Sequence, residues 1–279
     1  MTSALLALAI VSTIAAAVRS TWSPCGWSML STVTPLGEKG RGRSYPVTAT
    51  WFIAGAMVGG AVLGAAMAAL AGAVASVGPV SRTAAIGVGG LAALVGAASD
   101  ARVAGFSLPF HRRQVNEDWL DLYRPWVYGA GFGFQIGRGF ATYITTAAVY
   151  LMAVLGALTG QPLMAGMLGA LFGIARGLAV LVGRHLDTSE AMRSFHRRFD
   201  AAGEVSRRAT IGVQAGAGLV ALTVAFPRPP IAAAYAVVCA VTFVSLRRGR
   251  ALPSRSSRSS LRVSPHAAHT QRPALPEAT

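Results

Sequence analysis

The sequence predicts an all-α protein, a polytopic transmembrane helical bundle with two inverted repeats of three-helix type and six to seven spans. Of its 279 residues, 53% are hydrophobic and only 13% are charged, about half the charge of a typical soluble domain. Several apolar runs reach the roughly 20 residues that a helix needs to cross the hydrocarbon core. These runs lack the alternation of a transmembrane β-strand, so helices are expected.

Seven apolar regions follow one another along the chain. The first, 4–36, is expected to be a retained first span rather than a cleaved leader, since no basic residue precedes it. The others are 46–76, 83–103, 125–158, 163–183, 209–226 and 231–246. They define a membrane domain at 1–246, followed by a disordered, basic cytoplasmic tail at 247–279. Six spans remain if the first region does not cross fully.

The net charge of +15 is distributed as the positive-inside rule expects. With the N-terminus outside, 20 of the 25 basic residues fall in the inner segments 37–45, 100–124, 184–208 and 247–279. This predicts a multi-pass protein of the bacterial plasma membrane with its C-terminus in the cytoplasm. The bilayer and its anionic head groups are the expected partners, and no nucleic acid is expected because no nucleic-acid-binding motif accompanies the charge.

Two sequence elements recur in the same order and at similar spacing. A Gly-Leu-Ala heptapeptide is followed about 20 residues later by Phe-His-Arg-Arg, first at 90–96 and 110–113, then at 177–183 and 195–198. Three spans separate the two units, so the second is inverted, a common plan in membrane carriers with the working site at the repeat interface. The predicted parts are repeat one at 4–113, repeat two at 126–198 and a final hairpin at 209–246.

The first apolar region is interrupted by Ser23-Pro24-Cys25-Gly26, and Pro35 makes a second break. Proline lacks an N–H and disfavours helix before it, and glycine loosens a helix further. At these residues the chain resembles the transmembrane domain of the DsbD and CcdA thiol-disulfide electron carriers of cytochrome c biogenesis. The resemblance implies two inverted three-helix units, each opened by a broken helix that carries a cysteine.

The second unit departs from this pattern, because Arg138 stands where the second cysteine is expected. Disulfide exchange requires a second thiol. The other cysteine of the chain, Cys239, lies in an apolar run where a buried, inert thiol is expected. Catalytic redox use of Cys25 would therefore need Cys239 or an external thiol, such as that of a thioredoxin-like protein.

Arg138 lies within an apolar region, where an arginine is costly and usually faces a partner or a wet cavity. Helical spacing places Gln135, Thr142 and Thr145 on or near its face. With Cys25, these residues form the predicted binding site for a small anionic substrate. The alternative is that Arg138 snorkels or binds backbone carbonyls at the helix break. No metal site and no cofactor are expected.

Three functions remain open from the sequence. The first is a small carrier or permease-like protein of the DsbD/CcdA-like fold without a complete redox pair. The second is thiol-disulfide electron transfer across the membrane through Cys25, and the third is a non-catalytic membrane assembly partner. The sequence contains no Ser/His/Asp arrangement and no nucleotide-binding loop, so it gives little reason to expect an enzyme.

Overall fold

A computed structural model of the chain describes residues 3–78, 80–109, 122–140 and 142–226, and helices are the only regular secondary structure within them. The predicted all-α class is therefore confirmed for this part of the chain. The tail at 247–279, the last apolar region with Cys239, and the first Phe-His-Arg-Arg element lie outside the described residues.

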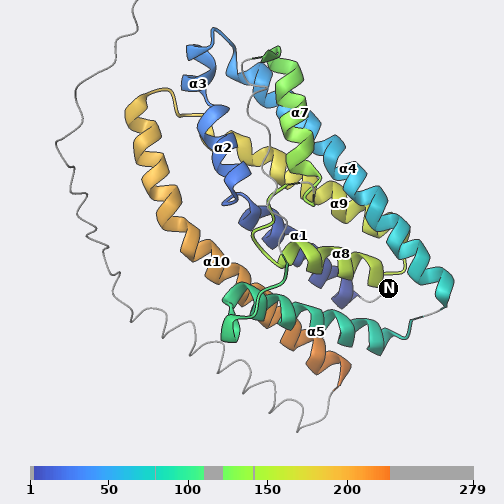
Figure 1. The fold of residues 1–279 in the computed structure, drawn as a ribbon. Helices are drawn as coiled ribbons and strands as arrows, with labels where there is room; N and C mark the ends of the chain where they lie inside the picture. The colour runs from blue at the N-terminus through green and yellow to red at the C-terminus, as the bar shows by residue number, and fades with distance from the viewer. Residues whose placement is uncertain (1–2, 79, 110–121, 141, 227–279) are drawn as a thin grey trace, which may run out of the picture.

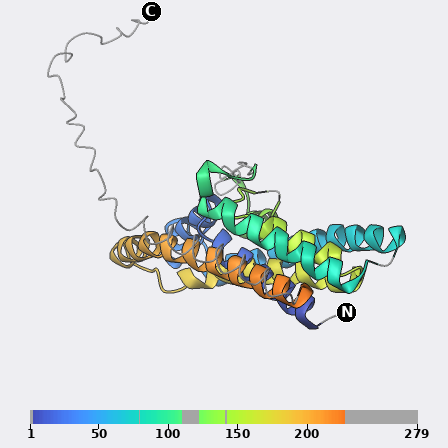
Figure 2. The same cartoon turned by 90° about the horizontal axis from the view of Figure 1, so that it is seen from below.

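The helices are arranged between two long ones. Figure 1 shows α4 (Tyr45–Val77) on one side and α10 (Ser189–Ala225) on the other, with shorter helices between them. These central helices are α1 (Ser3–Ser20), α8 (Ala148–Leu158) and α9 (Pro162–Leu178). In Figures 1 and 2, α5 (Arg82–Ala101) lies alongside the C-terminal half of α10. Two short 3-10 helices follow longer ones: η1 (Val103–Gly105) comes after α5, and η2 (Ala179–Gly183) comes after α9.

Within the described ranges, four helices are long and apolar enough to cross a bilayer, namely α4, α5, α10 and α9 together with η2. A fifth span results if α1 and α2 (Pro24–Thr32) are counted as one bent span, whose two parts differ in direction by 62°. The protein thus has the apolar helices that a multi-pass membrane protein requires. The counts of six or seven spans and the inverted repeat remain predictions.

The apolar region 125–158 is two short helices rather than one long one. The first of them, α7 (Pro125–Gly137), ends where Gly139 adopts a φ of 63°, a conformation that favours glycine. The described residues from there to Ala147 are not helical, and α8 begins at the next residue. Region 125–158 is therefore interrupted near Arg138, where the resemblance to the electron carriers implied a helix break, and the helical face expected from Gln135 to Thr145 is not continuous.

Helix α4 is packed between α7 and α9 through glycines on its surface. Gly60 meets Gly173 of α9 so closely that a Cβ on Gly60 would lie 2.6 Å from the Gly173 Cα. On the other side, a Cβ on Gly133 of α7 would meet the main chain of Phe52. Small residues at intervals of four let transmembrane helices approach to backbone contact, and Gly129, Gly133 and Gly137 of α7 follow that spacing. These three helices therefore form one tightly packed unit.

Helix α10 begins much earlier than its apolar half. The side chain of Thr188 accepts a hydrogen bond of 3.2 Å from the Ala191 N–H and caps the helix, which then runs for 37 residues. The polar stretch 184–208, expected to connect two spans, is therefore largely helix. Its buried contact is Phe199, whose ring stacks on Trp22 with centroids 4.7 Å apart.

Candidate functional site

The break between α1 and α2 positions Cys25 in the interior. Ser23 caps α2, since its hydroxyl accepts a hydrogen bond of 3.2 Å from the Gly26 N–H, and Pro24 is the first residue of the helix. Gly26 is required there, because a Cβ would strike the carbonyl group of Thr21. Cys25 itself is 0% exposed and belongs to an apolar cluster with Phe52 of α4.

A buried arginine lies close to Cys25. Arg176 of α9 is only 1% exposed, and Cys25 is near enough to interact electrostatically with its guanidinium. Within the described part of the chain, the Nε and Nη1 atoms of Arg176 have no hydrogen-bond partner. No carboxylate of the described residues forms an ion pair with it either.

Burying an unpaired arginine costs free energy of folding, so its presence suggests a functional role. Buried charges in proteins are normally paired and hydrogen-bonded, since an unpaired one loses its hydration without compensation. Ionisable residues inside membrane helices mark functional sites more often than structural ones. The unsatisfied donors of Arg176 present positive charge and hydrogen-bonding capacity beside the Cys25 sulfur, which suits an anionic or electron-rich group.

Arg138 occupies a different environment from Cys25. It caps the C-terminal end of α7, its side chain is exposed, and its guanidinium carbon lies 5.5 Å from the centre of the Phe134 ring. This is a cation–π contact at the protein surface. The buried arginine within electrostatic range of Cys25 is therefore Arg176, whereas Arg138 is exposed.

The other predicted site residues lie around the end of α7. The Gln135 amide donates a hydrogen bond of 3.4 Å to the Gly131 carbonyl, one turn earlier in the helix. Thr142 is buried and donates to the Gly139 carbonyl, while the Thr145 hydroxyl is buried without a partner among the described residues. Thr142 and Thr145 follow the helix end, so they do not continue the helical face of Arg138. Pro35 begins α3 (Pro35–Gly40), as Pro24 begins α2.

A buried carboxylate at Glu38 is not apparent from the sequence, in which it stands among the charged residues of a short segment. Glu38 belongs to α3 and is 0% exposed. Its two carboxylate oxygens accept hydrogen bonds of 2.6 Å from the hydroxyls of Tyr128 and Thr48, and Arg41 lies 3.4 Å away. Glu38 therefore joins α3 to α4 and α7, and its hydrogen bonds are satisfied.

A second polar cluster joins α5, α8 and α10. The carboxylate of Asp100 accepts hydrogen bonds from the Thr146 hydroxyl at 2.5 Å, the Ala147 N–H at 2.8 Å and the Gln214 amide at 2.8 Å. Gly96 leaves the space for Gln214, because a Cβ there would collide with the amide oxygen. This cluster holds the helices together. Within the described residues, no group of three His, Cys, Asp or Glu side chains could hold a metal ion.

The chain is similar to bacterial proteins named methylamine utilization protein MauF. It is 32% identical to the protein of Paracoccus versutus over 173 residues, which cover 58% of this chain and 60% of that protein. It is 34% identical to the protein of Paracoccus denitrificans over 175 residues, 61% of each chain. For the protein of Methylobacillus flagellatus, the identity is 31% over 185 residues, 65% of this chain and 64% of that protein. No family model and no solved structure matches the chain.

These similarities correct the resemblance drawn from Ser23-Pro24-Cys25. The matching relatives bear the MauF name, so the assignment to the DsbD and CcdA electron carriers is wrong, and with it the carrier or permease function expected from that fold. The reason is that Ser-Pro-Cys at a helix break is a short and general pattern. Three residues are too few to specify a family. The chain spans less than two thirds of the length of these curated relatives, and over that region it is similar to the methylamine utilization protein MauF.

Proposed function

We propose that this chain is a multi-pass membrane protein that serves the utilization of methylamine. The similarity to the MauF proteins of several bacteria carries the proposal, because their shared name states this role. The apolar helices agree with a role at a membrane. The sequence contains no Ser/His/Asp arrangement and no nucleotide-binding loop, which favours a role other than catalysis by a soluble enzyme.

Growth of the native host tests this proposal directly. Deleting the gene should abolish growth on methylamine as the sole source of carbon and nitrogen, and should leave growth on succinate with ammonium unchanged. A plasmid copy of the gene should restore growth on methylamine. Normal growth of the deletion strain on methylamine would overturn the proposal, and equal loss on both media would point to a general role in the membrane.

Within this function, we place the working site at Cys25 and Arg176. The support is the burial of Arg176, its unsatisfied donors and its proximity to the Cys25 side chain at the break between α1 and α2. Natural proteins retain such destabilising groups where activity depends on them. The stability of the folded protein and its activity should therefore respond in opposite directions when Arg176 is replaced.

Arg176→Met is expected to abolish growth on methylamine while making the purified protein more stable. Replacing a buried ion pair by apolar residues of similar volume is often neutral or stabilising by about 1–4 kcal/mol, and Arg176 has no ion-pair partner among the described residues whose attraction would be lost. Complementation of the deletion strain measures the activity, and thermal unfolding in detergent, followed by tryptophan fluorescence, measures the stability. If growth persists, Arg176 has no functional role; if the variant is strongly destabilised, the guanidinium has a structural partner.

Arg138→Met is the matched control, since it removes an exposed arginine. Exposed substitutions usually change stability by no more than about 0.5 kcal/mol, and growth on methylamine should be normal. Loss of growth in Arg138→Met with normal growth in Arg176→Met would instead locate the site at Arg138, as the sequence predicted.

The topology is also a proposal, namely six or seven spans in a bacterial plasma membrane with the N-terminus outside and the C-terminus in the cytoplasm. The distribution of basic residues supports it. We further propose that the basic inner surface contacts anionic lipid head groups. In support, Arg197 and Arg198 of the second Phe-His-Arg-Arg element are exposed on α10, while the preceding Phe195 and His196 pack against aromatic rings.

A further inference from the structure

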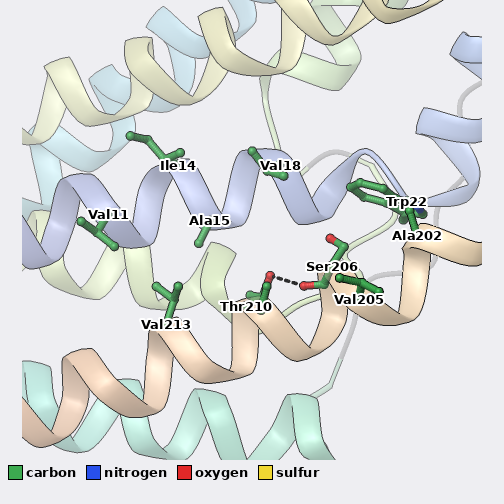
Figure 3. Close-up of a pocket in the computed structure, with 11 residues that line it drawn as sticks. Val11, Ile14, Ala15, Val18, Trp22, Ala202, Val205, Ser206, Thr210 and Val213 are labelled. Atoms are coloured by element: carbon green, nitrogen blue, oxygen red, sulfur yellow. Dashed lines mark hydrogen bonds between the residues drawn. The ribbon is translucent and has the colours of Figure 1, made fainter. Parts of the chain in front are cut away.

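An apolar groove runs between α1 and α10, and Figure 3 shows its wider part. The two helices are antiparallel there, with Trp22 near Ala202 at one end and Val11 near Val213 at the other. This part has a volume of about 470 Å³, which is room for several side chains. Most of its lining is aliphatic or aromatic, including Ile14, Val18, Trp22, Val205, Ala209 and Val213.

The groove continues toward the end of α10. A second hollow of about 290 Å³ lies between residues 4–11 of α1 and residues 216–224 of α10, and Val11 lines both hollows. Together they follow almost the whole of α1. We call this surface, lined by α1 residues from Ala4 to Trp22 and by α10 residues from Ala202 to Val224, the α1–α10 groove.

The opposite flank of α10 is already covered. Gly90 of α5 meets Gly218 of α10 so closely that a Cβ on Gly90 would lie 3.0 Å from the Gly218 carbonyl oxygen. Helix α5 therefore packs along the second half of α10 at backbone distance. On the other flank, the aliphatic side chains Val205 and Val220 remain exposed in the groove. An apolar segment that follows α10 has this flank available to it.

The sequence after α10 contains such a segment at 231–246. Prolines 227, 229 and 230 lack the backbone N–H that would continue α10, which ends at Ala225. As a helix, the 16 residues of 231–246 would be about 24 Å long, close to the about 26 Å of helical α1 that lines the groove. Because only five residues, 226–230, separate it from α10, a second membrane span here, as in the hairpin expected at 209–246, would run back beside α10, toward Trp22.

The residue pattern of the segment suits close packing in this groove. Ala232, Ala236 and Ala240 recur at intervals of four, which gives a helix one face of small residues. Cys239 is three residues after Ala236 and belongs to the same face. The groove is itself lined with small side chains, such as Ala15 and Ala209, so two small-residue faces can meet there.

We propose that the segment 231–246 forms a helix that returns antiparallel to α10 and fills the α1–α10 groove. The prolines end α10, the connection to the segment is short, and the segment has the length and the small-residue face that the groove accepts. In this arrangement Cys239 lies near Gly216, because Cys239 is eight residues beyond Ile231 and Gly216 is nine residues before Ala225. Gly216 lines the groove, and a Cβ added to it would meet no atom within 4 Å.

Cross-linking between Cys239 and an introduced cysteine tests this position. Full-length Gly216→Cys in membranes is treated with a short bismaleimide and digested, and linked peptides are identified by mass spectrometry. The matched control is Gly166→Cys, in an apolar groove between α4 and α9, where an added Cβ would make only ordinary contacts, at 3.8 Å from the Gly64 carbonyl oxygen and 4.0 Å from the Ala68 Cβ. We expect an intramolecular link from Cys239 to the cysteine at 216, several-fold more abundant than any link from Cys239 to the cysteine at 166.

The link must disappear in Gly216→Cys combined with Cys239→Ser, which excludes a link to Cys25. Links formed only between two molecules would overturn the proposal and indicate that a second copy occupies the groove. No link, with both introduced cysteines alkylated by N-ethylmaleimide in unfolded protein, would also overturn it and leave lipid as the occupant. Correct folding of each variant is checked by its elution from size-exclusion chromatography in detergent.

Discussion

Gly133→Leu is expected to prevent the protein from assembling into its native fold. A Cβ at Gly133 would meet the Phe52 carbonyl group and would lie 3.0 Å from the Ala56 nitrogen, both of them main-chain atoms of α4. Overpacking a core usually costs about 1–3 kcal/mol because side chains can shift. Here α4 and α7 would have to move apart, so the loss should be larger. Size-exclusion chromatography in mild detergent should show aggregated rather than monodisperse protein.

Gly212→Leu is the matched control for this effect. Gly212 lies on the exposed face of α10, and an added Cβ would meet no atom within 4 Å. The control should elute as the unmodified protein does, with a similar unfolding temperature. A monodisperse Gly133→Leu protein with unchanged stability would show that α4 and α7 are not in backbone contact at this point.

Glu38→Ala is the second substitution with a large expected effect. It leaves the hydroxyls of Tyr128 and Thr48 without their acceptor in a buried position and removes the ion-pair partner of Arg41. Breaking a buried, hydrogen-bonded charge typically destabilises a protein by about 3–5 kcal/mol. Thermal unfolding in detergent should therefore begin at a clearly lower temperature than for the unmodified protein.

Two further variants separate the hydrogen bonds from the removal of a glutamate as such. Glu38→Gln keeps one acceptor oxygen and should lose an intermediate amount of stability. Glu204→Ala removes an exposed glutamate that pairs with Arg207 and Arg208, and exposed pairs contribute only about 0–1 kcal/mol. Equal stability of Glu38→Ala and Glu204→Ala would contradict the buried role of Glu38.

Much of the helical framework could be predicted from hydrophobicity. The predicted region 46–76 is α4, and 83–103 is largely α5, since uninterrupted apolar runs between polar or glycine-containing turns leave few other possibilities. The N-terminal half of α10 could not be predicted in this way. It is polar on most sides and buries only a narrow strip around Phe199 against Trp22, so hydrophobicity reports a connection where a helix exists.

Of the two residues of the candidate site, Cys25 and Arg176, only Cys25 could be predicted from the sequence. Cys25 is indicated by the proline and glycine that flank it, because these are local signals of a helix break. Arg176 and Arg138 look alike in the sequence, since each interrupts an apolar region. Their difference in burial depends on where α7 ends, before Gly139 with its positive φ, and on which face of α9 is buried. The burial of Glu38 could not be predicted either, because it depends on contacts between α3, α4 and α7.

The length of α4 has a consequence for how the protein sits in a membrane. Its 33 residues extend about 50 Å, whereas the hydrocarbon core is about 30 Å thick. The exposed rings of Trp51 and Trp126, 6.0 Å apart, suit the head-group level at one surface. Hydrophobic mismatch then requires α4 to incline or to carry its last turns through the opposite head groups. Because α7 and α9 touch its backbone, any tilting of α4 must carry all three helices with it as one unit.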